Sequence, residues 1–146
     1  MPLDANKILT SAMVRVVNDQ TLKTILGGQI QAVKGPRRTK DMEGSNSFTL
    51  HVLSAPMDPD SKVYNGTLLI NFYCQNYSSG NAKVETMGPV AARVAELFDD
   101  RPLVIDGYNN FNLVVDEPLG PLFDSAYPNE HFMSIRIRFN LKKKGS

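Results

Sequence analysis

The last part of the chain alternates between apolar and polar side chains, and this pattern constrains the fold more than any other. From Phe132 to Lys144 the sequence reads FMSIRIRFNLKKK. The apolar residues share one parity: Met133, Ile135, Ile137, Phe139 and Leu141. The residues of the other parity are polar: Ser134, Arg136, Arg138 and Asn140. Because successive strand residues point to opposite faces, this pattern predicts a strand with one face on a hydrophobic core. Residues 142–146 are predicted to be a flexible tail beyond it.

The alternating arginines of this strand raise the question of nucleic-acid binding. Proteins that bind single strands interleave basic residues with exposed aromatic rings, whereas Phe139 has the parity of the core here. The formal net charge of only +1 also argues against a dedicated nucleic-acid binder. A solvated or subunit-facing role for Arg136 and Arg138 is therefore favoured. A nucleic-acid-binding module that uses Lys34 to Lys40 and Lys142 to Lys144 stays open as an alternative, which steeply salt-dependent affinity would support.

The rest of the chain predicts further strands and three helices. SFTLHVLSA and KVYNGTLLINFYCQNY alternate as strands do, and the proline- and aspartate-rich PMDPDS between them indicates a hairpin. Apolar stripes at helical spacing predict a helix capped by Asp4, and a short helix QTLKTIL that follows Asp19 and ends at Gly27-Gly28. They also predict a central helix that either kinks or begins at Pro89. QIQAV, PLVIDG and FNLVVDEP are further strand candidates, with GYNN as a turn and LGPLFDSAYPNE as a loop.

These elements predict one α+β domain over residues 1–146. The expected fold is a mostly antiparallel sheet with an N-terminal helix and a central amphipathic helix packed on one face. Residues 34–47 show no periodicity, contain two glycines and many charges, and are predicted to be a mobile loop. The chain length suits a single domain with a substantial core.

The sequence contains no recognisable catalytic constellation. His51, His131 and Cys74 are scattered singly, without the spacing of metal ligands. Cys74 shares parity with Ile70 and Phe72, which indicates a buried structural thiol rather than a nucleophile. GxSxG, P-loop, GxGxxG and HExxH motifs are absent from the sequence. We therefore expect no enzyme activity, no catalytic or metal-binding residue and no cofactor.

Several features that the sequence lacks indicate the cellular environment expected for this protein. The single cysteine fits a reducing environment, the start of the chain does not read as a signal peptide, and no apolar run approaches the length needed to span a bilayer. We expect no membrane association.

Charge is distributed unevenly along the chain. Between Glu96 and Glu130 there are eight acidic residues and one base, and five bases with no acid follow Glu130. A second basic cluster occupies Lys34 to Lys40 and contains Arg37 and Arg38. This cluster could contact phosphates, an acidic partner or another copy of the chain, or it could be a solvated loop. Such blocks can place opposite potentials on different surfaces.

The order of these segments resembles the tail-terminator or tail-completion proteins of long-tailed bacteriophages. The resemblance covers nearly the whole chain. It rests on the N-terminal helix that ends in LGGQI, on GTLLINFYCQNYSSGNA running into VETMGPVAARVAELFDD, and on the closing strand HFMSIRIRFNLK. The loop from Lys34 to Ser47 and the segment from Glu117 to Asn129 match this pattern less well.

The resemblance implies a structural virion protein with a small fold and no catalysis. It implies a hexameric ring that caps the end of the tail tube, terminates tail polymerisation and provides the head-joining interface. The implied partners are other copies of the chain, the tail tube protein and a head-completion protein, and DNA would pass through the lumen without specific binding. The implied location is the head-proximal end of the virion tail, after assembly in the host cytoplasm.

Two surfaces are expected from the resemblance and the charge blocks together. The candidate subunit or tube interface is Lys34, Arg37, Arg38, Lys40, Arg136 and Arg138. The candidate acidic lumen surface is Asp99, Asp100, Asp116, Glu117 and Asp124, which would repel passing DNA. A neck or head-completion protein that binds the portal side remains an alternative.

Overall fold

The computed structural model describes residues 3–145 and shows three helices and a six-stranded, mostly antiparallel sheet. The helices are α1 (Ala5–Val17), α2 (Gln20–Leu26) and α3 (Val84–Phe98), with a single 3₁₀ turn at Lys40–Met42. The strands are β1 (Ala32–Lys34), β2 (Ser47–Ser54), β3 (Val63–Gln75), β4 (Tyr108–Val115), β5 (Leu119–Leu122) and β6 (Glu130–Lys143). Their order is β1-β2-β3-β6-β4, and β5 pairs with the first half of β6. Only β1 and β2 pair in parallel, so the predicted α+β class is confirmed.

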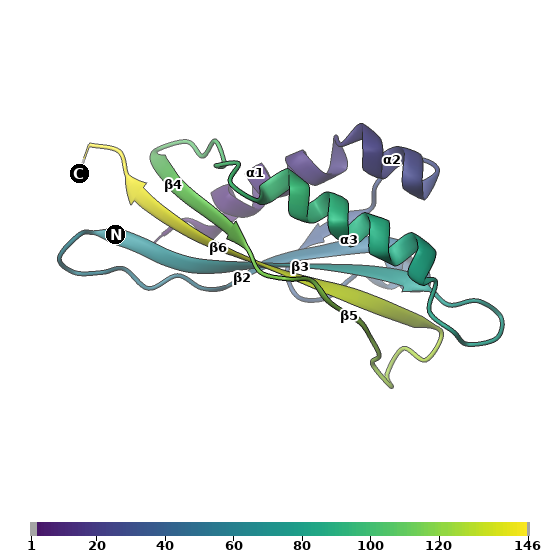
Figure 1. The fold of residues 1–146 in the computed structure, drawn as a ribbon. Coiled ribbons are helices and arrows are strands. Elements are labelled where there is room, and N and C mark those ends of the chain that lie inside the picture. Colours follow the sequence, from purple (N-terminus) through teal and green to yellow (C-terminus); the bar gives the residue numbers. More distant parts are fainter. Residues whose placement is uncertain (1–2, 146) are drawn as a thin grey trace.

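All three helices lie on one face of the sheet (Figure 1), as the sequence predicts for the first and the central helix. The Asp4 side chain accepts a hydrogen bond from the Asn6 N–H and begins α1, and Asp19 does the same for α2 through the Leu22 N–H. Gly27 ends α2 in the left-handed region, at φ 77°. The local chemistry of the caps thus sets where the first two helices begin and end.

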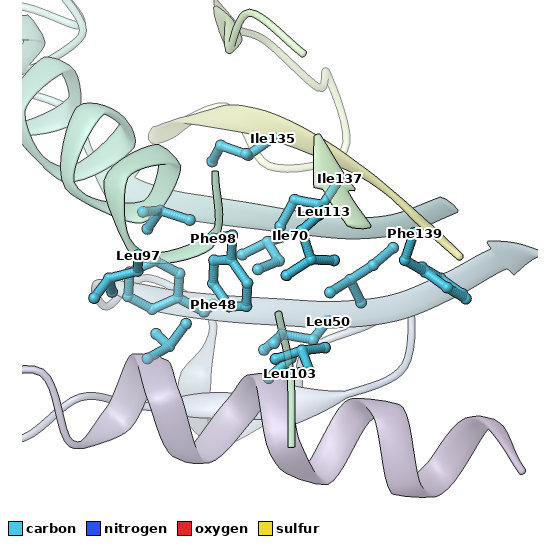
Figure 2. Close-up of a cluster of buried hydrophobic side chains, with 14 of the residues drawn as sticks. Phe48, Leu50, Ile70, Leu97, Phe98, Leu103, Leu113, Ile135, Ile137 and Phe139 are labelled. Carbon is cyan, nitrogen blue, oxygen red and sulfur yellow. The ribbon is translucent and has the colours of Figure 1, made fainter. Parts of the chain in front are cut away.

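The core lies between the helices and one face of β2, β3 and β6. Figure 2 shows Phe48, Ile70 and Ile137 from these strands meeting Phe98 of α3. The five apolar residues of the closing strand pattern are all buried, whereas Arg136 and Arg138 are exposed on the opposite face. The predicted orientation of this strand is therefore confirmed.

One close approach in the sheet requires glycine. Gly66 of β3 lies opposite Phe139 of β6, and the aromatic ring covers the position where a Cβ atom would project. An added Cβ would lie 2.3 Å from the Phe139 ring and 2.8 Å from the Ser54 carbonyl oxygen. The absent side chain lets the phenyl ring pack onto the strand.

Several boundaries differ from those the sequence predicts. The β6 strand continues through Lys142 and Lys143, because they pair with Val63 of β3 and Tyr108 of β4, so the predicted tail begins too early. The expected turn GYNN is the start of β4, and Leu119–Leu122 within the expected loop forms β5. In each case the long β6 strand supplies backbone partners that the local sequence does not reveal.

The segment PLVIDG and the start of the central helix also differ. PLVIDG makes only an isolated bridge between Ile105 and Tyr108 rather than a strand. The α3 helix begins at Val84 and has Pro89 inside it, so it does not begin at the proline, and the buried Met87 packs the preceding turn onto the core. Because proline has no N–H, the helix lacks one backbone hydrogen bond at Pro89.

Candidate interaction surfaces

Arg38 is buried against the face of the sheet that the helices leave uncovered. Its guanidinium group forms a two-pronged ion pair with the Glu130 carboxylate, with 2.9 Å between Nη1 and Oε2. It also stacks on Tyr73, 3.9 Å from guanidinium carbon to ring centroid, and lies 5.4 Å from the Tyr127 ring. Only 3% of the Arg38 side chain is exposed. The structure therefore corrects its assignment to an exposed interface, since this side chain binds the 35–46 segment to the sheet.

Lys34 is also engaged within the chain. It belongs to β1, and its ammonium group donates to Asn6 Oδ1 at 2.8 Å and Thr10 Oγ1 at 2.7 Å on α1. Arg37 and Lys40, by contrast, are exposed and form no ion pair with any residue between 3 and 145. Of the basic cluster at Lys34 to Lys40, these two residues present free charge at the surface.

The segment predicted as a mobile loop at 34–47 is tied to the sheet at several points. The Gly35 N–H donates to the Leu50 carbonyl at 2.7 Å, and Ser45 Oγ contacts Gln31 Oε1 at 3.1 Å. With Arg38 buried in the middle, the segment has both ends and its centre attached. The lack of periodicity reflects an irregular path rather than an absence of contacts.

Arg136 and Arg138 both lie on the uncovered face, but only Arg136 has no ion pair within the described part of the chain. Arg138 pairs with Asp116, with 3.0 Å between Nη2 and Oδ1. Both partners of this pair are substantially exposed, so its contribution to stability is small. The pair shows that a predicted interface residue and a predicted lumen residue share one surface.

Three of the predicted acidic residues gather at one hollow. Asp99, Asp116 and Glu117, with Glu96, line an open hollow of about 400 Å³ between the ends of α3 and β4. Asp99 Oδ1 also accepts from the Val115 N–H at 3.3 Å. The Asp100 N–H donates to the Leu113 carbonyl at 3.0 Å, so the chain at 99–100 covers part of the free edge of β4.

Asp124 lies apart from these residues. It lines a different hollow together with Arg37, Arg38 and Tyr127, and its carboxylate accepts from the Ala126 N–H at 2.9 Å. The predicted acidic surface is therefore two surfaces, and Asp124 belongs beside the basic segment.

A groove crosses the end of the sheet where β3 finishes and β6 begins. It consists of three adjoining hollows of about 420, 160 and 350 Å³. The first and second share Ala126 and Tyr127 along their border, and the second and third share Pro128 and Asn129. Its walls carry tyrosine, proline and asparagine side chains, and Arg37 lines one end. We call this feature the end groove, lined by Pro36, Arg37, Tyr73, Tyr77, Tyr127 and Pro128.

The sequence analysis missed the end groove and the buried ion pair. Glu130 is 92 residues from Arg38, so no local pattern links them. The one available signal is the group of large side chains Leu122, Phe123 and Tyr127, which lie close together in the polar loop predicted there. Large apolar side chains in such a segment suggest a contact surface.

The isolated histidines and the cysteine have structural surroundings. Burial raises the pKa of the Cys74 thiol and lowers the pKa of His51, which keeps both groups uncharged at neutral pH. Cys74 is buried, as predicted from its parity. His131 Nδ1 lies 2.6 Å from Asn76 Oδ1. Across residues 3–145, no three His, Cys, Asp or Glu side chains are grouped to hold a metal ion, and no helix is long and apolar enough to cross a membrane.

Taken as a class, the chain is an α+β domain with its helices on one face of a mostly antiparallel sheet and irregular segments on the other. Its fold is similar to that of a chain in the virion of a native gene transfer agent (GTA) particle, with a TM-score of 0.68, 12% identity and 94% of each chain covered. A second solved structure, whose name states no function, aligns with a TM-score of 0.61 and 12% identity over 99% of this chain and 100% of its own. No protein-family model and no curated protein sequence matches the chain. At this identity the similarities establish a shared fold.

Proposed function

We propose that this chain is a structural virion protein that forms a ring on the end of a phage-type tail tube. In this role it terminates tube growth and provides the surface to which the head joins. The observation that carries the proposal is the fold similarity to a chain of the GTA virion, which extends over 94% of both chains.

The surfaces of the molecule support an assembly role. A ring with one repeating contact needs two different patches on each copy, one for each neighbour. Arg37, Lys40 and Arg136 present free positive charge, whereas Glu96, Asp99 and Glu117 are gathered at the hollow beside α3. We propose that basic patches face protein partners and that the acidic hollow faces the lumen. A lumen of this sign would let DNA pass without holding it.

Tube growth is the direct assay for this function. Purified tail tube protein is polymerised with and without this chain, which is supplied in excess over the growing tube ends, and tube lengths are measured by electron microscopy. The proposal predicts shorter tubes with material at one end. Unchanged lengths, with the protein bound instead to purified portal or neck complexes, would assign it to the head side of the joint.

A further inference from the structure

Two features at opposite ends of the molecule have complementary shapes and chemistry. The first is the turn between β2 and β3, Pro56 to Lys62, in which every residue is exposed. The second is the end groove. Figure 1 shows the turn at the far left and the segments that line the groove at the right. The 13 residues of β3 separate them, which corresponds to about 40 Å of extended chain.

The β2–β3 turn is rigid, although it protrudes. The Asp58 N–H donates to the Val63 carbonyl at 2.8 Å, and the Lys62 N–H donates to the Asp58 carbonyl at 2.8 Å. A bridge between Met57 and Tyr64 closes its base. A segment that is already ordered loses little entropy when it docks.

The turn exposes proline, carboxylate and apolar groups together. It presents Pro56 and Pro59, the carboxylates of Asp58 and Asp60, and Met57, which is 43% exposed. A hydrogen bond from the Asp60 N–H lowers the pKa of the Asp58 carboxyl group, which favours its charged form. The turn is thus a proline-rich, acidic ridge with one apolar side chain.

The end groove offers the matching surfaces. Tyr127 and Tyr77 are partly exposed along it, so their rings are available to pack against the proline and methionine side chains of the turn. Arg37 at one end has no ion-pair partner among residues 3–145, so its charge is available to a carboxylate. Buried Arg38 and Glu130 hold the groove wall in place. Asp124 lines the same hollow as Arg37 but forms no ion pair with it, so the positive charge of Arg37 stays available.

We propose that the β2–β3 turn of one copy of this chain docks in the end groove of a second copy, with Asp58 or Asp60 facing Arg37. Because β3 holds the two features apart within one chain, a molecule cannot fill its own groove. The contact is therefore intermolecular and head-to-tail, the type that closes into a ring when its rotation allows. The inference rests on the proposed ring and identifies the contact that builds it.

Cysteine cross-linking tests this contact directly on the full chain. One preparation carries Ser61→Cys in the turn, a second carries Ala126→Cys in the groove, and a mass tag on one of them identifies mixed dimers. These positions leave Asp58, Asp60 and Arg37 in place. The control partner carries Ala92→Cys, another exposed alanine, which lies on α3 outside the groove. The native Cys74 is buried with a raised pKa, so it reacts slowly and can stay in place.

The expected result is that mixed dimers of Ser61→Cys with Ala126→Cys form roughly tenfold faster than those of Ser61→Cys with Ala92→Cys, because docking raises the local thiol concentration. A single chain with Ser61→Cys and Ala126→Cys should give a ladder of covalent oligomers. Equal rates for the two pairs would overturn the contact, whether the unmodified chain is monomeric or not. If oligomers of the unmodified chain form while the two rates are equal, the ring survives without this contact. Fast cross-linking in a chain that does not shorten tubes would instead refute the proposed function alone.

Discussion

Replacement of Arg38 by methionine should destabilise the fold far more than the same replacement of its neighbour Arg37. The Arg38 guanidinium and the Glu130 carboxylate are almost fully buried, with 3% and 5% of their side chains exposed. Removal of one partner leaves the other charge buried without compensation, which costs about 3–5 kcal/mol. Arg37 is exposed, so Arg37→Met should change the free energy of unfolding by less than about 0.5 kcal/mol.

The double replacement makes this prediction specific to the ion pair. Glu130→Leu alone should also cost about 3 kcal/mol or more, because it strands Arg38. Arg38→Met with Glu130→Leu exchanges a buried ion pair for apolar side chains of similar volume, and such exchanges are often nearly neutral. The double variant should therefore be more stable than either single variant, by about 3 kcal/mol or more.

Urea unfolding followed by far-ultraviolet circular dichroism measures these differences, at one fixed protein concentration for all variants because self-association would shift the transition. A double variant whose loss equals the sum of the two single losses would refute the reasoning, since it would show that Arg38 and Glu130 act independently. Losses below 1 kcal/mol for both single variants would place this pair in solvent.

Three further predictions concern other parts of the fold. Gly66→Ala should destabilise the protein by about 1–3 kcal/mol, since Phe139 and the β2 backbone must move. Gly28→Ala, where space is open, should change stability by less than about 0.5 kcal/mol. Equal urea midpoints for the two variants would contradict this prediction. The hydrogen bond from Arg93 lowers the pKa of the Asp19 carboxyl group in the folded state. The ionised carboxylate therefore stabilises the fold above the unfolded-state pKa, and this contribution is lost as pH falls through the folded-state pKa. Asp19→Ala should lower the free energy of unfolding by about 1–2 kcal/mol at pH 7 and make it fall less steeply as the pH is lowered. An unchanged dependence on acid pH would count against this role of Asp19. Cys74 should react with a thiol reagent roughly 100-fold more slowly in the folded protein than in urea, and similar rates in both would show that it is accessible.

Local patterns in the sequence predict much of this fold. Asp4 and Asp19 as helix caps, Gly27 as a helix end and PMDPDS as a turn depend on neighbouring residues, and each is confirmed. The orientation of β6 follows from period-two alternation, which the pleat of a strand imposes. These features share a physical basis, because each is decided within a few residues of chain.

The candidate surfaces depend on contacts between residues that lie far apart in the sequence, which no local pattern predicts. Arg38 meets Glu130 across 92 residues, and Asp116 meets Arg138 across a strand pair. Charge blocks in the sequence therefore suggested separate basic and acidic surfaces, whereas folding buries Arg38 and places Asp124 beside Arg37. Strand β5 was missed for a related reason, since its Gly–Pro sequence disfavours a strand and only the pairing with β6 creates it.

The most direct test of the central claim is to count copies of this chain on single tail tubes. Each copy carries one fluorophore, purified tubes are immobilised, and the photobleaching steps of each bound spot are counted by fluorescence microscopy. The proposed ring predicts spots at one end of each tube, with about six steps if it is the hexamer that the resemblance to tail-terminator proteins implies, since each copy of a closed ring carries one fluorophore. Spots spread along the tubes, or tubes that bind no labelled protein at either end, would contradict it.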